Sequence, residues 1–412
     1  MGERGRSLRL LILGLNYAPE EIVIGPYTAQ LAQGLVARGH RVTAIAGNPY
    51  YPQWRHWPGF AGVSDRMEEG VRVVRVPHHV PRRPGAVGRV LQQLSFAAAA
   101  HGPAMRLAAG GLDAVLAIAP PLLAAPVAIL TARRSGARLW LHVQDFEAEA
   151  ARATGLLGAR GAKAALAIER RLLGAADLVS TISPQMVARL AEKGIASARL
   201  LEMRNWTDPA LDFAAADGTQ LRAALGLGAR RIALYSGNLG RKQGLETLLA
   251  AARQLRGRDD LVVLICGEGP ERAALEAAAV GLPNIRFADL RPRAELAALL
   301  ALAEIHLLPQ IAGAADVVLP SKLTNILASG RPVVAGAAPG TGLAEEIAGC
   351  GIAVTPGDGA AFAAAITHLL DTPALSAAYS AGARRRAADR WGRETIIDTA
   401  ERRLRHLCGG TP

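Results

Sequence analysis

Short apolar runs alternate with helical patterns along this chain, and the alternation occurs twice. Each apolar run ends in turn residues, and an amphipathic stretch then follows. This order is typical of parallel β-strands whose connecting helices cover both faces of a sheet. We therefore expect an α/β protein with two doubly wound, Rossmann-like domains. The predicted strands are 8–13, 42–46, 71–76, 114–117, 138–143 and 178–182 in the first half, and 231–236, 261–266, 285–287, 305–308, 332–335 and 351–354 in the second.

The pattern loosens at residues 195–213, which we interpret as the link between the domains. We predict a first domain at 1–200, a second at 208–385, and a C-terminal helix at 386–412 that returns to the first domain. A chain of 412 residues is long enough to give each domain its own core. Ligands of doubly wound sheets bind at the carboxyl ends of the strands, so we expect the site in a cleft between the domains.

The formal net charge is +12, and nearly all of the excess lies in the first half. Residues 1–206 hold 25 Lys and Arg against 14 Asp and Glu, whereas the rest of the chain holds 22 against 21. A one-sided basic surface favours an anionic partner such as a nucleic acid or an acidic membrane face. We disfavour nucleic acid, because no readout motif is present and the aromatic residues are not interleaved with the basic ones.

A candidate membrane-facing helix lies at residues 82–107. Four apolar residues share one helical face and three arginines flank it: Val87, Val90, Leu91 and Leu94, with Arg82, Arg83 and Arg89. Such a pattern can lie in a membrane interface. The alternative is a helix packed on the sheet with an exposed basic edge.

The cysteines and the N-terminus indicate the compartment. Cys266, Cys350 and Cys408 are far apart and form no CxxC pair, so we expect a reducing compartment and no metal site. Basic residues precede the first apolar run, as in a signal peptide. The run is short and no small-residue cleavage site follows, so a first buried strand is the better interpretation.

One segment places a lysine, an amide and a hydroxyl on a short helix. Residues 316–335 are D-V-V-L-P-S-K-L-T-N-I-L-A-S-G-R-P-V-V-A. Ser321 can cap the helix that follows, and Lys322, Asn325 and Ser329 share its polar face. A lysine beside the open N–H groups of a helix start favours a phosphate, so a nucleotide diphosphate suits this segment. The alternative is a capped surface helix that leads into the next buried strand.

Lysine is rare in this chain. Only four of the 47 basic residues are lysines: Lys163, Lys193, Lys242 and Lys322. A compact ammonium group binds phosphate as a point charge, whereas arginine suits flat bidentate partners. The composition therefore supports a phosphate site at Lys322.

Four turns that carry glycine follow predicted strands. Glycine permits positive φ and close ligand approach, so each turn could bring backbone N–H groups to an anion. A Walker sequence is absent, and no G-x-G-x-x-G follows the first strand, which argues against nucleotide hydrolysis and ordinary dinucleotide binding. The turns hold Asn16 and Gly25; Gly237, Gly240, Arg241, Lys242 and Gly244; Gly267, Glu268 and Gly269; and the segment 320–330.

Polar residues also follow the predicted strand 138–143. His142, Asp145 and Glu147 lie at a strand end that should face the cleft. We select His142 and Asp145, with Lys322, as catalytic candidates, and Asp145 as the best single residue for contact with an acceptor or a donor sugar. The alternative for Asp145 is a helix cap for the segment after it.

Several motifs occur in one order along the chain. They are L-N-Y-A-P-E at 15–20, H-V-Q-D at 142–145, G-N-L-G-R-K-Q-G-L at 237–245, C-G-E-G-P-E at 266–271, N-I-R-F-A-D-L at 284–290, P-S-K at 320–322 and A-S-G-R-P-V-V-A at 328–335. The last five resemble the retaining GT-B glycosyltransferases of family four. The first two resemble the colanic-acid, WcaI-like fucosyltransferase type within it.

The resemblance implies two Rossmann-like domains, a nucleotide-sugar donor held mainly by the second, an acceptor approached by the first, and no obligatory metal or other cofactor. By position it places Arg241, Lys242 and Lys322 at the donor diphosphate. Glu268 and Gly269 come near the nucleoside. The positions assigned to the donor are Gly25, Gly237, Asn238, Gly240, Arg241, Lys242, Gly267, Glu268, Gly269, Leu290, Ser321, Lys322, Leu323 and Asn325.

The resemblance also shows a departure from the family. Two glutamates of an E-x7-E pair are missing by this alignment: Val317 takes the place of the first, and Asn325 takes the place of the second, which binds ribose hydroxyls. An amide can still hydrogen-bond a ribose diol. Asp316 or Ser321 can contact the sugar.

We therefore expect a cytoplasmic glycosyltransferase at the inner face of the cell membrane. It would move a sugar, with GDP-fucose as the first donor to test, onto a lipid-diphosphate-linked glycan in exopolysaccharide assembly. A sugar-nucleotide epimerase of the same architecture is one alternative. A nucleotide-sugar-binding protein without catalysis is the other.

Overall fold

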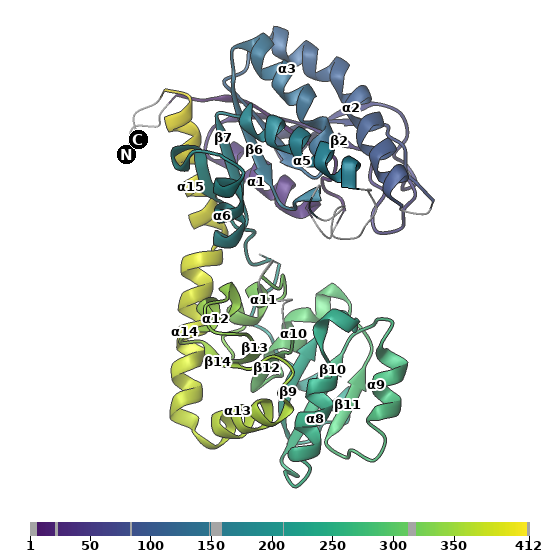
Figure 1. Ribbon diagram of the computed structural model, residues 1–412, viewed down its shortest axis with the longest axis vertical. Coiled ribbons are helices and arrows are strands. Elements are labelled where there is room, and N and C mark those ends of the chain that lie inside the picture. Colours follow the sequence, from purple (N-terminus) through teal and green to yellow (C-terminus); the bar gives the residue numbers. More distant parts are fainter. Residues whose placement is uncertain are drawn as a thin grey trace. The chain divides into compact units, whose positions relative to one another are not determined.

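The computed structural model describes residues 6–20, 24–82, 85–147, 149, 159–208, 210–311 and 319–409. The chain divides into two compact units (Figure 1). The first comprises Met1–Asn205 and Ile396–Pro412, and the second comprises Trp206–Thr395. Each unit contains one sheet with helices packed against it, as the alternating pattern predicts.

The sheet of the first unit has eight strands in the order β3-β4-β2-β1-β5-β6-β7-β8. All neighbours are parallel except β3, which runs antiparallel to β4 at one edge. The strands are β1 (Arg9–Gly14), β2 (Arg41–Gly47), β3 (Ser64–Glu68), β4 (Val71–Val76), β5 (Ala114–Ala119), β6 (Arg138–Val143), β7 (Leu178–Thr181) and β8 (Leu200–Glu202). Chain order therefore reverses between β1 and β5, whose carboxyl ends flank the expected crevice.

The helices of this unit follow the strands. Four of them, α2, α3, α5 and α6, contribute apolar side chains to one buried cluster on the sheet. The helices are α1 (Gly25–Ala37), α2 (Ala86–Ala109), α3 (Ala125–Ser135), α5 (Ala159–Gly174) and α6 (Pro184–Glu192), with the short 3-10 turns η1 (Leu122–Ala124) and η2 (Ser197–Arg199).

The last helix, α15 (Arg393–Leu407), packs with the first unit from Ile396 onward. The Arg38 guanidinium pairs with Asp398, and His40 Nε2 lies 3.2 Å from Glu401 Oε1. The preceding helix, α14 (Pro373–Trp391), belongs to the second unit. The expected boundary at 386 therefore falls inside α14 rather than at a helix start, because Ala383, Ala387 and Trp391 are all in the core of the second unit.

The sheet of the second unit has six parallel strands in the order β11-β10-β9-β12-β13-β14. They are β9 (Arg231–Ser236), β10 (Leu261–Cys266), β11 (Ile285–Ala288), β12 (Ile305–Leu308), β13 (Val333–Gly336) and β14 (Gly351–Val354). Counted within the unit this is the order 3-2-1-4-5-6, so the crevice is expected at the carboxyl ends of β9 and β12.

Short helices connect these strands. The connecting elements are α7 (Thr219–Ala224), η3 (Arg241–Gln243), α8 (Glu246–Gln254), α9 (Arg272–Ala278), η4 (Arg293–Glu295), α10 (Leu296–Ala301), α11 (Leu323–Ala328), α12 (Gly342–Ile347) and α13 (Gly359–Asp371). The central strands are buried along their whole length, which explains why their sequences are continuous apolar runs.

Candidate functional site

The loops after β9 and β10 are hydrogen-bonded to each other beyond the ends of their strands. Gly237 N donates to Cys266 O at 2.9 Å, and Leu239 N donates to Glu268 O at 2.7 Å. A Cβ on Gly267 would lie 1.8 Å from Gly237 O, and one on Gly269 would lie 2.4 Å from Leu239 O. Only glycine at these two positions allows the loops to approach so closely.

This pairing corrects one expectation from the sequence. We expected the N–H groups of Gly237 and Gly267 to face a ligand, but Gly237 N is bonded to Cys266 O and Gly267 N donates to Ala288 O at 3.0 Å. These two glycines serve the packing of the loops on each other. These loops lie beside Lys322, because a Cβ on Gly237 would be 3.0 Å from Lys322 Nζ.

Lys322 is half-buried, and its ammonium group lies next to these loops. Its Nζ lies 3.9 Å from the centroid of the Tyr235 ring, which offers a cation–π contact. Among the described residues no carboxylate lies within 4.0 Å of this ammonium group. Burial lowers the pKa of Lys322 from 10.5 to about 8. A buried cation that lacks a counter-ion favours an anionic ligand, which would restore its charged form.

The helix that follows Lys322 begins differently from our prediction. α11 starts at Leu323, Lys322 occupies the N-cap position, and no side chain caps the helix. The prediction that Ser321 caps it is wrong, because Leu323 N already donates to Pro320 O at 2.9 Å. Ser321 is exposed and Asn325 is half-buried, while Leu323 is in the core. Asp316 and Val317 lie outside the described residues.

The turn after β9 continues into η3. The Arg241 side chain is 88% exposed, and its Nε lies 3.9 Å from Glu271 Oε1. Asn238 is exposed, and its carbonyl accepts from Tyr235 Oη at 2.6 Å. Gly240 is buried, and its carbonyl accepts from Gln243 N at 3.0 Å. The Lys242 side chain lies outside what the structure describes.

Two amides at this edge are unpaired. Gln243 follows β9 and Gln310 follows β12, and the Oε1 atom of each is buried with no hydrogen-bond partner in the described part of the chain. The backbones come together here, because a Cβ on Gly244 would lie 3.2 Å from the carbonyl carbon of Gln310. Neither glutamine was among the residues predicted from the sequence. Their position after the two strands that flank the crevice is the signal that could have found them.

The proposed nucleoside positions lie around the loop after β10. Glu268 Oε1 pairs with Arg272 Nη1 at 2.7 Å, and Arg272 Nη2 is 2.8 Å from Asp289 Oδ1. The Leu290 side chain is 60% exposed. An exposed apolar side chain just after β11 suits contact with a flat base.

In the first unit, His142 does not lie in a site. Its ring is buried inside β6, and Nδ1 lies 2.8 Å from Ser180 Oγ. Trp140 Nε1 donates to the same oxygen at 2.7 Å. Burial lowers the pKa of His142 to about 3. Its selection as a catalytic residue is wrong, because side chains alternate along a strand and this one points into the core.

Asp145 does lie beyond the end of β6, at the edge where strands end in this unit. Its side chain reaches the surface, yet the surrounding atoms desolvate it and raise its pKa, with Arg89 acting in the opposite direction. The segment that it could cap lies mostly outside the described residues. Asp145 is therefore an accessible carboxylate whose ionised form the charge of Arg89 favours.

Glu147 joins three elements at the same edge. Its Oε2 accepts from Leu122 N at 2.9 Å, and its Oε1 accepts from Gln93 Nε2 of α2. Gln93 Oε1 accepts from Leu123 N at 3.2 Å. Burial raises the pKa of Glu147, and the bonds from Leu122 and Gln93 oppose this effect. We interpret Glu147 as a residue that fixes the loop after β6 against α2 and η1.

The loop after β1 depends on Glu20, which was not among the predicted site residues. Glu20 is buried; its Oε1 accepts from both Tyr50 N and Tyr51 N at 2.9 Å, and its Oε2 accepts from Asn16 Nδ2 at 2.8 Å. A Cβ on Gly25 would lie 3.1 Å from Glu20 O. Gly25 therefore makes room for this loop, which gives the glycine a packing role.

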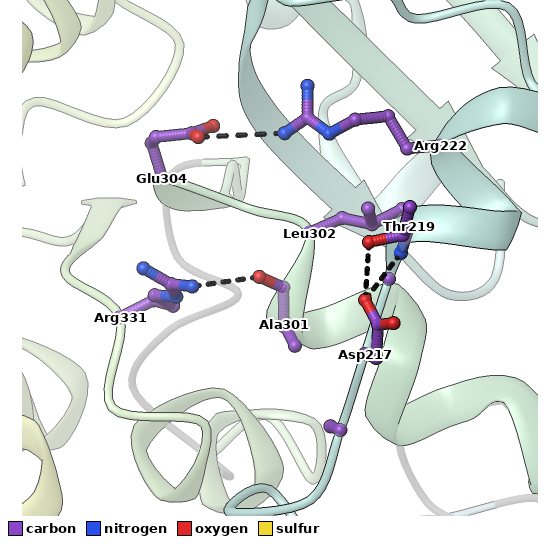
Figure 2. A pocket seen from close by; sticks show the side chains of 9 residues that line it. Asp217, Thr219, Arg222, Ala301, Leu302, Glu304 and Arg331 are labelled. Atoms are coloured by element: carbon purple, nitrogen blue, oxygen red, sulfur yellow. Dashed lines mark hydrogen bonds and ion pairs between the residues drawn. The ribbon is translucent and has the colours of Figure 1, made fainter.

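A hollow of about 260 Å³ lies at the opposite edge of the second sheet, where strands begin (Figure 2). Asp217 Oδ1 accepts from Thr219 Oγ1 at 2.6 Å, and Arg222 Nη2 lies 3.7 Å from Glu304 Oε1. Arg331 Nη2 donates to Ala301 O at 2.9 Å. Because these groups satisfy one another, nothing here requires a charged ligand.

Neither a metal cluster nor a membrane span is present in the described part of the chain. It contains no group of three or more His, Cys, Asp or Glu side chains that could hold a metal ion. No described helix has both the length and the apolar character needed to cross a bilayer.

Comparison with known proteins agrees with this architecture. Residues 24–206 match the model of the glycosyl transferase 4-like domain, and residues 230–372 match that of the glycosyl transferases group 1. The chain is 40% identical over 379 residues to the colanic acid biosynthesis glycosyl transferase WcaI of Escherichia coli (strain K12), covering 89% of this chain and 93% of WcaI. The chain belongs to the family-four glycosyltransferases. The second match lies within the second unit, and the first lies within the first unit except for its last residue, Trp206.

Solved structures of low identity share the same fold. Sucrose-phosphate synthase from Thermosynechococcus elongatus superposes with a TM-score of 0.72 at 19% identity, covering 97% of this chain and 99% of the synthase. HepE of Anabaena, solved in complex with UDP-glucose, superposes with a TM-score of 0.65 at 16% identity, covering 96% and 99%. These likenesses identify the two Rossmann-like units as a GT-B fold.

Proposed function

We propose that this glycosyltransferase moves a sugar from a nucleotide-diphosphate donor to a lipid-diphosphate-linked glycan, with retention of anomeric configuration, in exopolysaccharide assembly at the inner face of the cell membrane. GDP-fucose is the first donor to test. The observation that carries the proposal is the half-buried ammonium of Lys322, which has no carboxylate partner among the described residues and lies beside the loops that follow β9 and β10. The name of the WcaI relative and the UDP-glucose complex of HepE support the acceptor pathway and the donor class, respectively.

The reaction exchanges one bond at the anomeric carbon. The bond from C1 to the diphosphate oxygen breaks, the bond from C1 to the acceptor oxygen forms, the acceptor hydroxyl loses its proton, and the nucleoside diphosphate leaves. The leaving group gains negative charge as the bond breaks, so a cation held in place without water favours the transition state. Lys322 has this role in our proposal.

The first unit supplies the acceptor side of the proposal. Asp145 is accessible at the end of β6 and its pKa is raised, so it can accept a hydrogen bond, or a proton, from an acceptor hydroxyl. The buried carboxylate of Glu20 and the half-buried carboxylate of Glu147 hold the surrounding loops. We expect no dependence of the rate on added divalent metal.

The test is a panel of nucleotide sugars incubated with the purified full-length chain, with and without an undecaprenyl-diphosphate-linked glycan. We expect one donor to be consumed only when the acceptor is present, and the product anomer, assigned by NMR couplings, to match the donor anomer. Consumption of no donor would overturn the transferase proposal. Donor conversion without acceptor would instead indicate an epimerase.

A second candidate is a nucleotide-sugar-binding protein without catalysis. Asn325 in the place of a family glutamate favours this candidate. Calorimetry with GDP and UDP separates the two: tight binding without turnover of any donor would support binding alone.

A further inference from the structure

The solvent-facing side of α2 is apolar over its first three turns. Val87 is 74% exposed, Val90 is 44% exposed, and Leu91 and Leu94 are each 49% exposed. The opposite side of the helix is buried through Phe96, Ala100 and Ala104. We call Val87, Val90, Leu91 and Leu94 the α2 stripe. A water-exposed helix face normally carries polar residues, so a contiguous apolar stripe indicates a partner.

The sequence around the α2 stripe contains no acidic residue. Residues 70–112 hold six arginines and no Asp or Glu. Arg82, Arg89 and Arg106 are exposed in the described part of this segment. The stripe therefore lies in a basic segment of a basic unit. A partner that complements it has both negative charges and apolar groups.

Aromatic side chains lie beside the first turns of α2. The Arg89 guanidinium carbon is 5.9 Å from the centroid of the Trp54 ring, and the Trp54 ring centroid is 5.9 Å from that of Tyr51. Both aromatic side chains are half-buried. Tryptophan and tyrosine next to arginine, on the edge of an apolar surface, are typical of protein surfaces at the headgroup level of a bilayer.

We propose that the α2 stripe lies in the headgroup region of a bilayer that contains anionic phospholipid, with Arg82 and Arg89 on lipid phosphates. An amphipathic helix binds such a surface through buried apolar area and through attraction to anionic lipids. A second copy of this chain is the less suitable occupant, because it would bring the same arginines together. The inference rests on the proposed function only in the choice of a membrane as the site of the acceptor.

The position of α2 in the fold links the membrane contact to the candidate acceptor residue. Arg89 acts on the pKa of Asp145, and Gln93 bonds to Glu147, so the stripe is joined to the edge of the sheet where β6 ends. A bilayer bound along α2 would bring lipid headgroups to the same edge. The candidate acceptor residue Asp145 would then lie within reach of a glycan attached to a lipid diphosphate.

The test is sedimentation of the full-length chain with vesicles, in the absence of any sugar. The vesicles are phosphatidylcholine alone, or phosphatidylcholine with phosphatidylglycerol at about seven to three, a content at which each nearby basic residue contributes about 1 kcal/mol. We expect binding to the anionic vesicles only. Leu91→Glu with Leu94→Glu should lower the partition coefficient at least about tenfold, because two apolar groups leave the interface and two negative charges enter it.

The control variant carries the same charge change elsewhere. Met67→Glu with Val280→Glu replaces side chains that are 68% and 83% exposed and are not part of α2, and this variant should bind like the wild type. Arg82→Gln should weaken binding to anionic vesicles about fivefold and leave neutral vesicles unaffected. Circular dichroism and thermal melting of each variant confirm that it is folded.

Three results would overturn the proposal. The first is wild-type-like binding by the Leu91→Glu, Leu94→Glu variant. The second is equal binding of the wild type to neutral and anionic vesicles. The third is a wild-type dimer, seen by light scattering without vesicles, that the double variant abolishes, since the stripe would then bind a second copy. Transfer to a water-soluble glycoside acceptor is measured separately, so failure of the membrane contact and failure of the transferase proposal are distinguishable.

Discussion

The loops beyond the carboxyl ends of the strands are held differently in the two units. In the second unit, the loops after β9 and β10 are held by backbone hydrogen bonds between glycine-containing segments, and the Lys322 ammonium group beside them has no carboxylate partner among the described residues. In the first unit, carboxylate side chains hold the loops: Glu20 binds the backbone after β2, and Glu147 binds η1 and α2. Backbone loops beside an ammonium group suit a diphosphate, the group that our proposal places there. Side-chain contacts on loops are easier to vary and suit the recognition of a particular acceptor.

The largest effect is expected where a substitution forces apart the hydrogen-bonded loops after β9 and β10. Gly267→Ala places a Cβ 1.8 Å from Gly237 O at a φ of +155°, so the two loops must separate. We expect a loss of about 3 to 5 kcal/mol in the free energy of unfolding and no measurable donor binding. Urea denaturation and calorimetry measure the two. Gly257→Ala, in open space in the same unit, is the control and should behave like the wild type.

Lys322→Met tests the single charge. The ammonium group is replaced by an apolar side chain of similar length, so we expect GDP or UDP to bind about 100-fold more weakly, with little loss of stability, because no carboxylate among the described residues loses a partner. Calorimetry and thermal melting give both quantities. Unchanged nucleotide affinity would show that the diphosphate binds elsewhere.

Asp145→Asn tests the accessible carboxylate beyond the end of β6 in the first unit. The substitution removes a charge but keeps the shape of the side chain, so we expect kcat/KM for the acceptor to fall about 100-fold while the affinity for the donor is unchanged. Initial rates at varied acceptor concentration measure the effect. Asp65→Asn is the matched control, because Asp65 lies on β3 in an exposed ion pair with Arg72 of β4. A parallel loss of donor affinity would assign Asp145 to the donor instead.

The pKa of Lys322 predicts opposite pH dependences for stability and binding. Its pKa is about 8 in the folded protein and 10.5 ordinarily, so between these values the unfolded chain binds more protons. Without donor, the free energy of unfolding should therefore rise with pH over this range. Nucleotide affinity should fall by up to about tenfold per pH unit above pH 8, because the charged form is the one that binds. Lys322→Met should remove both dependences; if they persist in this variant, another group is responsible.

The smallest effect is expected at Arg241. Its side chain is 88% exposed and its nearest carboxylate oxygen is 3.9 Å away, so a contact with the diphosphate would be screened by water. We expect Arg241→Ala to weaken nucleotide binding only about threefold. A loss as large as that of Lys322→Met would show that the loop moves onto the donor when the donor binds.

Most of the fold was predictable from the sequence. The twelve strands predicted from apolar runs are all present, with ends that differ by at most two residues. The two strands that were not predicted lie at the edges of the first sheet: β3 is polar and largely exposed, and β8 has only three residues. Neither carries the buried pattern on which the prediction depends.

The site was predictable only in part. The position of Lys322 near a glycine turn followed from motif order, and Asp145 followed from its place after a strand. His142 and Ser321 were assigned wrongly, because the first faces the core and a backbone carbonyl takes the hydrogen bond expected of the second. Glu20, Gln243 and Gln310 were not predicted, because their burial depends on segments far away in the chain. For the two glutamines, the place after β9 and β12 was the one signal in the sequence.

The sequence by itself determined the two-domain α/β architecture and the family, because periodic burial and motif order are written in consecutive residues. The tertiary structure decided what each polar group does there. Whether a glycine N–H meets a carbonyl or a ligand, and whether a lysine keeps its charge without a counter-ion, depends on which distant loops pack against it. Desolvation and hydrogen bonding act between segments that only the folded chain brings together.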